Sequence, residues 1–143
     1  LVEKHGKGLY ELIRDKAENR DVFFIYGGVD AEQREQVRAI TEKSNNAIIV
    51  ASYGTFSTGI NIRNLHNIIF ASPSKSRIRN LQSIGRGLRL GDNKVNATLY
   101  DIADDMQYKS KENFTLKHFQ ERINIYTEEE FDYEIHNIEL KDR

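Results

Sequence analysis

Three arginines and a glutamine recur at helical spacing in the middle of the chain. They are three, four and three residues apart, so a helix over 75–90 places them on one face: Arg79, Gln82, Arg86 and Arg89. Guanidinium groups on one face repel one another unless an anion lies across them. Gly85 and Gly87 each cost about 1 kcal/mol relative to alanine in a helix interior, which indicates a close backbone approach there. The pattern favours an anion-binding stripe, and a solvated helix face with tolerated glycines is the alternative.

A loop rich in hydroxyls and glycine precedes that helix. It covers Ser52–Asn61 and follows the apolar run Ala47–Ala51, which has the length of a buried strand. At the carboxyl end of a parallel sheet such a loop lies where ligands bind. Its hydroxyls and backbone N–H groups suit phosphate oxygens without adding charge. An ordinary Ser/Gly-rich connector has a partly similar composition, so this loop alone leaves both interpretations open.

Carboxylates are missing around these two segments. No Asp or Glu occurs from Lys43 through Gly91, a stretch of 49 residues, although 22 of the 143 residues are acidic. An even spread would place about seven to eight carboxylates there. Such a segment offers no carboxylate ligand for Mg²⁺ and no carboxylate base, but it suits phosphate oxygens. A basic surface that only aids solubility is the alternative.

The composition excludes several classes of protein. With 143 residues the chain is long enough for one domain, and it begins with Leu1 rather than Met, as a piece of a longer protein would. Residues 1–100 carry 15 basic and 10 acidic residues (+5), residues 101–143 carry 6 and 12 (−6), and the formal net charge is −1. The absence of cysteine excludes disulfides and thiol chemistry, and the four histidines show no metal-ligand spacing. No apolar run approaches a membrane span, so a cytoplasmic protein without membrane contact is expected.

The elements that position these groups follow from hydrophobic periodicity and turn signals. We expect helices at 7–19, after Asp30, at 75–90 and around 116–126. We expect strands at 22–25, 47–51, 67–71 and 97–102, with a strand-like alternation at 131–135. Asp30 should cap its helix with Gln33 at the third position, and Val37 and Ile40 should form its inner face. The helix over 75–90 should dock on the sheet through a second, apolar stripe: Ile78, Leu81, Ile84 and Leu88.

The order of these elements predicts the fold class. Fully apolar strands that alternate with helices indicate an α/β fold with an open, mostly parallel sheet and helices on both faces. A short helix/strand extension follows at the C-terminus. We therefore expect one domain over residues 1–105. Residues 106–143 form an acidic extension that packs on it or leads to a further domain.

Three segments together resemble the superfamily 2 helicases. Gln82–Arg89 is similar to their motif VI, Q-x-x-G-R-x-x-R, and Ser52–Thr55 through Gly59–Asn61 looks like motif V. Tyr26–Val29 with Glu32 and Arg34 resembles the stretch between motifs IV and V. The three segments occur in the family's order across most of residues 1–100. The joint match is far more specific than any one of them.

The resemblance implies the second of two RecA-like domains in an ATP-driven motor. In this family ATP lies between the domains, and the first domain supplies the Walker A and DExH motifs that hold ATP and Mg²⁺. This sequence has neither motif, and it begins too late to contain the first strand of the family's second domain. The upstream RecA-like domain of the same polypeptide is therefore the expected partner, and the fragment alone should not hydrolyse ATP.

The resemblance also implies a role for individual residues. Arg86 and Arg89 would be arginine fingers that reach the γ-phosphate, while Gln82, Gly59 and Asn61 would border the nucleotide. Contacts with the nucleic-acid backbone would come from a loop and from two cations that precede the arginines: Ser52, Gly54, Thr55, Lys75 and Arg77.

The implied activity is ATP-dependent unwinding or migration of DNA or an RNA–DNA hybrid, with forks, junctions or R-loops as substrates in recombination and repair. Two alternatives remain open. One is a non-catalytic nucleic-acid-binding module that retains the helicase fold. The other is a restriction-type or RNA-directed translocase of the same superfamily, because motif VI does not distinguish among substrates.

Overall fold

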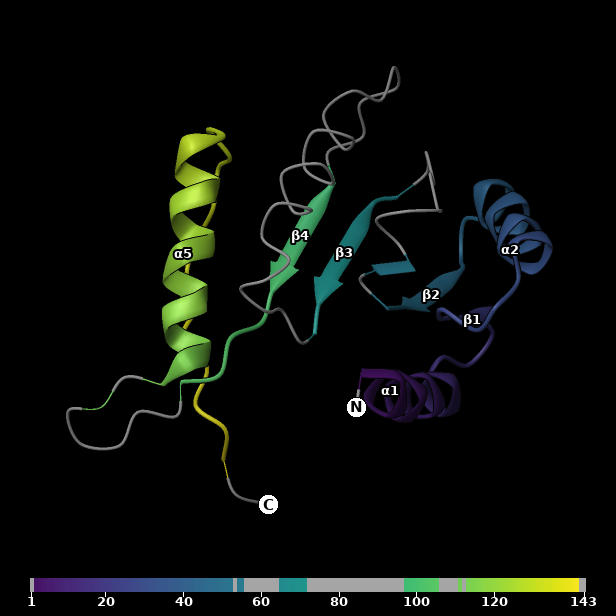
Figure 1. The fold of residues 1–143 in the computed structure, drawn as a ribbon, viewed down its shortest axis with the longest axis horizontal. Coiled ribbons are helices and arrows are strands. Elements are labelled where there is room, and N and C mark those ends of the chain that lie inside the picture. Colours follow the sequence, from purple (N-terminus) through teal and green to yellow (C-terminus); the bar gives the residue numbers. More distant parts are fainter. Residues whose placement is uncertain are drawn as a thin grey trace. The chain divides into compact units, whose positions relative to one another are not determined.

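The computed structural model describes residues 2–52, 54–55, 65–71, 97–105, 111 and 113–141. In chain order their elements are α1 (Val2–Lys16), β1 (Val22–Ile25), α2 (Ala31–Lys43), β2 (Ile48–Ala51), β3 (Asn67–Phe70), β4 (Thr98–Asp101) and α5 (Phe114–Glu128) (Figure 1). They belong to two compact units. The first holds the described residues up to 68 and those from 97 to 100; the second holds those from 69 to 71 and from 101 onward.

The first unit is built on a parallel pair of strands. β1 and β2 pair in the register Val22↔Ile48 through Ile25↔Ala51. The core of this unit is centred on Ile25 of β1. Its side chain is fully buried and packs against Val37, Ile49, Ala51 and Leu65. The strand predicted at 22–25 is confirmed without change, and the strand predicted at 47–51 begins one residue later.

Helices cover both faces of this strand pair. The Phe24 ring stacks on Tyr10 of α1 with ring centroids 5.7 Å apart. The next residue, Ile25, packs against Val37 of α2. Successive strand residues point to opposite faces, so α1 and α2 lie on opposite sides of β1, as Figure 1 also shows. The prediction of parallel strands with helices on both faces is confirmed for this part of the chain.

The first helix begins earlier and ends earlier than predicted. α1 runs over Val2–Lys16 rather than 7–19. It contains Gly6, where a Cβ atom would lie only 3.0 Å from Phe24 Cε2, so this glycine lets the helix approach β1 closely. The helix ends before Glu18, whose φ of 51° is incompatible with a continuing right-handed helix.

The second helix begins with the predicted cap. Asp30 Oδ1 accepts a hydrogen bond from the Gln33 backbone N–H at 2.8 Å. Its predicted inner face is only partly right, because Val37 reaches the core whereas Ile40 is 47% exposed. Thr41 takes the inner position instead. It is buried, and its hydroxyl donates to the Val37 carbonyl oxygen at 2.7 Å, which satisfies the polar group.

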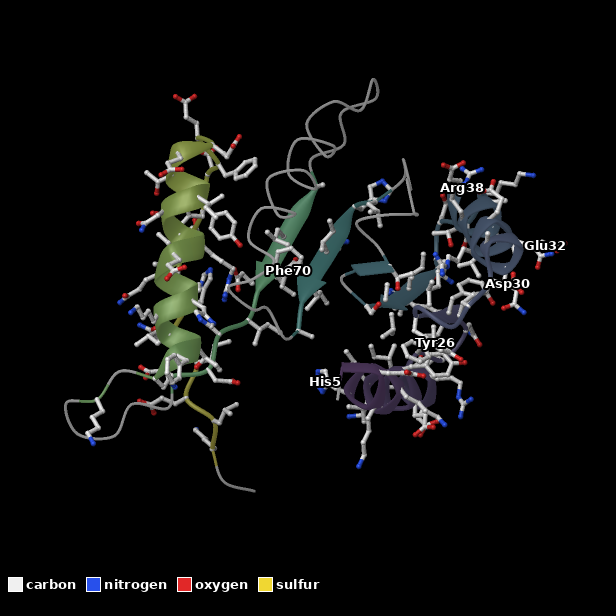
Figure 2. All side chains as sticks on the ribbon, in the orientation of Figure 1. His5, Tyr26, Asp30, Glu32, Arg38 and Phe70 are labelled. Atoms are coloured by element: carbon white, nitrogen blue, oxygen red, sulfur yellow. The ribbon has the colours of Figure 1, made fainter. Side chains whose placement is uncertain are left out.

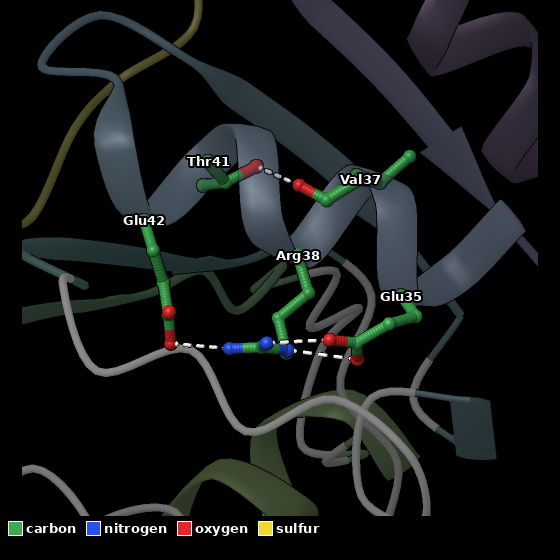
Figure 3. Close-up of polar contacts among 5 residues, drawn as sticks. All are labelled: Glu35, Val37, Arg38, Thr41 and Glu42. Carbon is green, nitrogen blue, oxygen red and sulfur yellow. Dashed lines mark hydrogen bonds and ion pairs between the residues drawn. The ribbon is translucent and has the colours of Figure 1, made fainter. Parts of the chain in front are cut away.

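An ion triad lies along a partly exposed side of α2 (Figure 3). Arg38 Nε donates to Glu35 Oε2 at 2.8 Å, and Arg38 Nη1 lies 2.7 Å from Glu42 Oε1. The spacings of three and four residues bring the three side chains to one side of the helix. The hydrogen bond from Arg38 lowers the pKa of the Glu35 carboxyl group, and the bonds to Glu35 and Glu42 raise the pKa of Arg38.

A second pair of strands consists of β3 and β4. Thr98 N–H donates to the His66 carbonyl at 2.8 Å, and Ile102 N–H donates to the Phe70 carbonyl at 3.2 Å. Each donor comes 32 residues after its acceptor, so the two strands run in the same direction. The strands predicted at 67–71 and 97–102 are thus confirmed to within one residue at their ends. Within the described residues the strands form these two parallel pairs, and a single open sheet stays a prediction.

The helix predicted around 116–126 is confirmed as α5. Asn113 caps its start by accepting a hydrogen bond from Leu116 N–H at 2.9 Å. At its end, Phe131 N–H donates to the Tyr126 carbonyl at 2.9 Å and Glu130 N–H donates to Thr127 at 3.1 Å. This pair of bonds is a Schellman motif, and Glu130 occupies its left-handed position with a φ of 55°.

The strand-like alternation predicted at 131–135 is wrong. The chain from 131 to 141 contains neither a strand nor a helix. The Phe131 backbone N–H takes part in the hydrogen bonds that end α5. The ring centroids of Phe131 and Tyr133 each lie 6.3 Å from the centroid of the Tyr126 ring. The aromatic residues therefore fold back on the helix instead of entering a sheet.

Two further expectations stay predictions. The predicted helix over 75–90 lies outside the described residues, and no feature of the structure tests the domain boundary at 105. None of the helices in the described part of the chain is long and apolar enough to cross a membrane.

Candidate functional site

The candidate site lies where β1 and β2 end. The register pairs Ile25 with Ala51, so the two strands reach the same edge of the sheet. Ser52 N–H then donates to the Ile25 carbonyl at 3.1 Å and extends the ladder by one bond. Tyr26 and Ser52 therefore leave the sheet side by side, at the carboxyl edge where α/β proteins bind ligands.

Arg34 braces the turn that follows β1. Val29 N–H donates to the Tyr26 carbonyl at 3.0 Å and closes the turn. Arg34, from the first turns of α2, donates from Nε to the Val29 carbonyl at 2.9 Å and from Nη2 to the Gly27 carbonyl at 3.4 Å. The guanidinium thus holds the turn on the start of the helix, which is a structural reason for an arginine at this position.

An aromatic stack fixes the other side of this turn. Tyr26 stacks on Phe24 with centroids 5.1 Å apart, and Phe24 stacks in turn on Tyr10 of α1. Arg14 lies over the Tyr10 ring, 5.5 Å from its centroid. Figure 2 shows Tyr26 on the side of β1 that α1 covers. The stack links the candidate site to α1, and its residues are separated in sequence, so periodicity alone did not reveal it.

Two hydroxyl groups lie just after β2. Ser52 Oγ and Thr55 Oγ1 lie 2.6 Å apart and form a hydrogen bond. Thr55 is only 6% exposed, whereas the position that a Cβ of Gly54 would occupy has no heavy atom within 4 Å. Thr55 is therefore an anchor that orients Ser52, and a Cβ atom added at Gly54 would enter open space.

This edge offers hydroxyls and backbone rather than carboxylates. Asp30 is the acidic residue that directly follows the Tyr26–Val29 turn, and its carboxylate accepts the capping bond of α2. Across the part of the chain that the structure describes, no group of three His, Cys, Asp or Glu side chains could hold a metal ion. The donors at the edge suit an anion such as a phosphate group.

Only part of the predicted site is described. Ser52, Gly54 and Thr55 lie together at the carboxyl edge of the β1–β2 pair. The nucleotide-binding residues, the arginine fingers and two predicted nucleic-acid contacts lie outside the described residues: Gly59, Asn61, Gln82, Arg86, Arg89, Lys75 and Arg77. Their roles stay predictions.

A second polar cluster was not predicted from the sequence. Asp101, at the end of β4, accepts hydrogen bonds from Arg122 and Tyr126 of α5. A signal for it exists, because Phe119, Arg122 and Tyr126 recur at spacings of three and four residues on one face of the helix. An arginine within an otherwise apolar stripe indicates a buried acidic partner.

The match to known proteins agrees with these features. Residues 2–91 match the model of the helicase conserved C-terminal domain. The chain therefore belongs to this family, and the resemblance to superfamily 2 helicases drawn from residues 26–89 is confirmed.

Two relatives specify the likeness further. The chain is 38% identical to the "ATP-dependent DNA helicase uvsW" of Enterobacteria phage T4 over 146 residues, which cover 95% of this chain and 29% of the phage protein. It is 32% identical over 99 residues to the "Putative ATP-dependent helicase IRC3" of Saccharomyces cerevisiae, which covers 68% of this chain and 14% of the yeast protein. The chain thus spans less than a third of either relative. No solved structure matches it.

Proposed function

We propose that this chain is the second motor domain of an ATP-dependent helicase that unwinds or migrates branched DNA or RNA–DNA hybrids in recombination and repair. The match of residues 2–91 to the helicase C-terminal family carries the proposal. The likeness to the phage T4 helicase, which extends over 95% of the chain, supports DNA as the substrate class. The site of action is then the cytoplasm, which is that of the host cell if a phage encodes the protein.

The chemistry of this domain is electrostatic. ATP, held with Mg²⁺ by an upstream RecA-like domain, supplies the phosphoryl group whose transfer to water drives the motor. Arg86 and Arg89 would place fixed positive charge around the phosphoryl oxygens, since arginine stays protonated and offers a planar fork. Gln82, Gly59 and Asn61 would border the nucleotide and couple it to the loop after β2.

Nucleic-acid binding would use the carboxyl edge of the β1–β2 pair. Ser52 and Gly54 would contact the phosphate backbone, and Thr55 would hold Ser52 in place through their 2.6 Å hydrogen bond. Lys75 and Arg77 would add positive charge. Contacts of this kind carry little base information, so the enzyme would select DNA by its structure rather than its sequence.

The decisive experiment joins this chain to its upstream domain and measures ATP hydrolysis with and without forked DNA. We expect the parent to be stimulated by DNA and Arg86→Ala to lower kcat by about 10³-fold or more, because an arginine finger contributes this much. DNA binding by Arg86→Ala should be largely retained. The matched control is Arg38→Ala, whose guanidinium is already occupied by Glu35 and Glu42 on a partly exposed helix face.

Three outcomes would contradict the proposal. Turnover of ATP by the 143-residue chain alone would show that it is not half of a two-domain site. An equal loss of DNA binding and hydrolysis in a folded Arg86→Ala protein would assign the arginines to nucleic-acid binding alone. A joined protein without ATPase activity would favour the non-catalytic module.

A further inference from the structure

Tyr26 is the first residue after β1, and Ser52 is the first residue after β2. Ile25 pairs with Ala51, and the bond from the Ser52 N–H to the Ile25 carbonyl continues this register by one residue. Paired strands lie about 5 Å apart, so the backbones of Tyr26 and Ser52 are neighbours at the carboxyl edge. An aromatic ring and a hydroxyl group therefore start from adjacent points of this edge.

The Tyr26 ring is held in place before any ligand binds. It stacks on Phe24 with ring centroids 5.1 Å apart and an interplanar angle of 28°, and Phe24 stacks in turn on Tyr10. Gly28 lies so close to the ring that a Cβ atom there would collide with it. The Tyr26 carbonyl accepts the Val29 N–H at 3.0 Å, which fixes the backbone as well. A ring confined in this way loses little conformational freedom when another flat group stacks on it.

The row formed by Tyr10, Phe24 and Tyr26 has one end at this edge. Arg14 lies over Tyr10 at the other end of the row. Among the residues that the structure describes, Phe24 is the one aromatic residue that stacks on Tyr26. Tyr26 is also only partly buried, whereas Ile25 beside it is fully buried. Tyr26 is therefore the end of the row at which another ring can be added.

We propose that Tyr26 is a stacking platform for an unpaired nucleobase, a proposal that rests on the nucleic-acid binding proposed above. In a nucleotide the base is joined to the phosphate through a single sugar, so a phosphate at Ser52 brings a base close to Tyr26. Every base has a π face, so stacking on a protein ring adds affinity without reading the sequence. The platform thus adds a contact with the base to the contacts with the backbone.

The platform determines which form of the substrate this edge prefers. In a duplex each base is already stacked on its neighbours, so a base must leave the stack to reach Tyr26. The phosphate contacts of Ser52 and Gly54 are available in a duplex and in a single strand alike. Tyr26 therefore makes this edge a binding site for the unpaired strand of a branched substrate.

The test uses the joined two-domain protein and measures its affinity for two single strands of equal length by fluorescence anisotropy. One strand has thymine bases, and the other is abasic, so both carry the same phosphates. We expect Tyr26→Leu to weaken binding of the thymine strand about tenfold and to leave binding of the abasic strand unchanged. Tyr26→Phe keeps the ring and should retain the affinity of the parent. Tyr133→Leu, which removes a tyrosine ring from the exposed C-terminal segment, is the matched control and should not affect either strand.

A second variant reports on the platform directly. The chain has no tryptophan, so Tyr26→Trp adds a fluorophore at this position, and its emission is the difference between the spectra of variant and parent. A base that stacks on the indole ring quenches this emission. We expect quenching by the thymine strand and none by the abasic strand.

The outcomes separate the stacking role from a structural role and from the proposed function. If Tyr26→Leu weakened binding of both strands equally, the ring would only support the fold of the edge, and the platform would be ruled out. If Tyr26→Leu does not fold, a Tyr26→Trp protein whose emission responds alike to both strands overturns the proposal instead. Failure of the proposed function looks different, since the parent itself would then bind neither strand.

Discussion

Two neighbouring glycines after β1 have different surroundings. A Cβ atom on Gly28 would lie 2.6 Å from Tyr26 Cε2, whereas one on Gly27 would have no heavy atom within 4 Å. Neither glycine has a positive φ, so backbone strain does not distinguish them. The difference comes from the Tyr26 ring, which is confined by its stack on Phe24.

Gly28→Ala should therefore destabilise the chain more than Gly27→Ala. The added methyl group forces the Tyr26 ring away from Phe24, and overpacking of this kind costs about 1–3 kcal/mol. Gly27→Ala should stay within about 0.5 kcal/mol of the parent, because its methyl group enters open space. Urea unfolding of both variants measures the difference, and equal effects would mean that Tyr26 moves without cost.

The residues that end α5 are unfavourable for a helix terminus in two ways. Glu130 adopts a left-handed backbone at the position where glycine is commonest. Three successive glutamates, Glu128–Glu130, also place negative charge near the negative end of the helix dipole. The motif nevertheless forms, because Phe131 and Tyr133 pack beside Tyr126 and two backbone hydrogen bonds close the turn.

Glu130→Gly should stabilise the chain by about 0.5–1 kcal/mol, since glycine adopts this backbone without the clash of a Cβ. Glu130→Gln separates the effect of charge from that of the backbone. Glu129→Gly is the second control, because Glu129 has an ordinary φ of −85° and the change there should destabilise the chain. Thermal unfolding of the three variants measures these effects. If Glu130→Gln stabilised the chain as much as Glu130→Gly, the charge of Glu130 and not its backbone conformation would be the source of the instability.

The ion triad of α2 gives the chain a small pH dependence. Arg38 lowers the pKa of Glu35 below its ordinary value of 4.5, so folding favours the ionised carboxylate. Its contribution to stability is complete above pH 4.5 and is lost as the pH falls through the lower pKa of the folded state. The effect is small, because the pair is exposed and screened by solvent.

We therefore expect Glu35→Gln to lose stability less steeply than the parent as the pH falls below 4.5. Urea midpoints measured at intervals between neutral pH and about pH 3 provide the comparison. Glu139→Gln, an exposed carboxylate outside α2, is the matched control and should keep the slope of the parent. Parallel curves for all three proteins would show that Arg38 does not influence Glu35 in solution.

Opposite charges are concentrated in different parts of the chain. The first 100 residues have a charge of +5 and the remaining 43 a charge of −6. The proposed binding of nucleic acid would therefore use one part of the surface rather than the overall charge. The proposed contacts of Lys75 and Arg77 then determine how strongly binding depends on salt.

DNA affinity should fall about tenfold as salt rises from about 50 to 200 mM, because two cations that neutralise phosphates give a slope of about −2 in log affinity against log salt. Lys75→Ala/Arg77→Ala should remove most of this slope. Lys117→Ala, an exposed lysine on α5, should leave it unchanged. Fluorescence anisotropy with forked DNA measures all three, and a flat response in the parent would exclude phosphate contacts.

Local patterns predicted most of what lies close together in sequence. The strand at 22–25, the cap at Asp30 and the helix over Leu116, Phe119 and Tyr126 all follow from spacing or turn chemistry, and all are confirmed. The motifs predicted the family correctly, because their order along the chain is itself informative. Of the predicted site, the structure brings Ser52, Gly54 and Thr55 to one edge of a sheet.

Contacts between distant residues could not be read from the sequence. The helical period allows either Ile40 or Thr41 to lie on the inner face of α2. Which of the two is buried depends on how α2 packs over Ile25. The alternation at 131–135 has the period of a strand, but the rings of Phe131 and Tyr133 pack beside Tyr126 of α5 instead. The partner of Arg122 lies 21 residues away, beyond the range of any local pattern.

The bond between Asp101 and Arg122 also restricts how such proteins can be recombined. A chimaera that joins two relatives between residues 102 and 113 would take the carboxylate from one parent and the guanidinium from the other. If the second parent has an apolar residue at position 122, the Asp101 carboxylate is buried without a positively charged partner. Grafts should therefore carry residues 101–126 as one block, whichever relative supplies the rest.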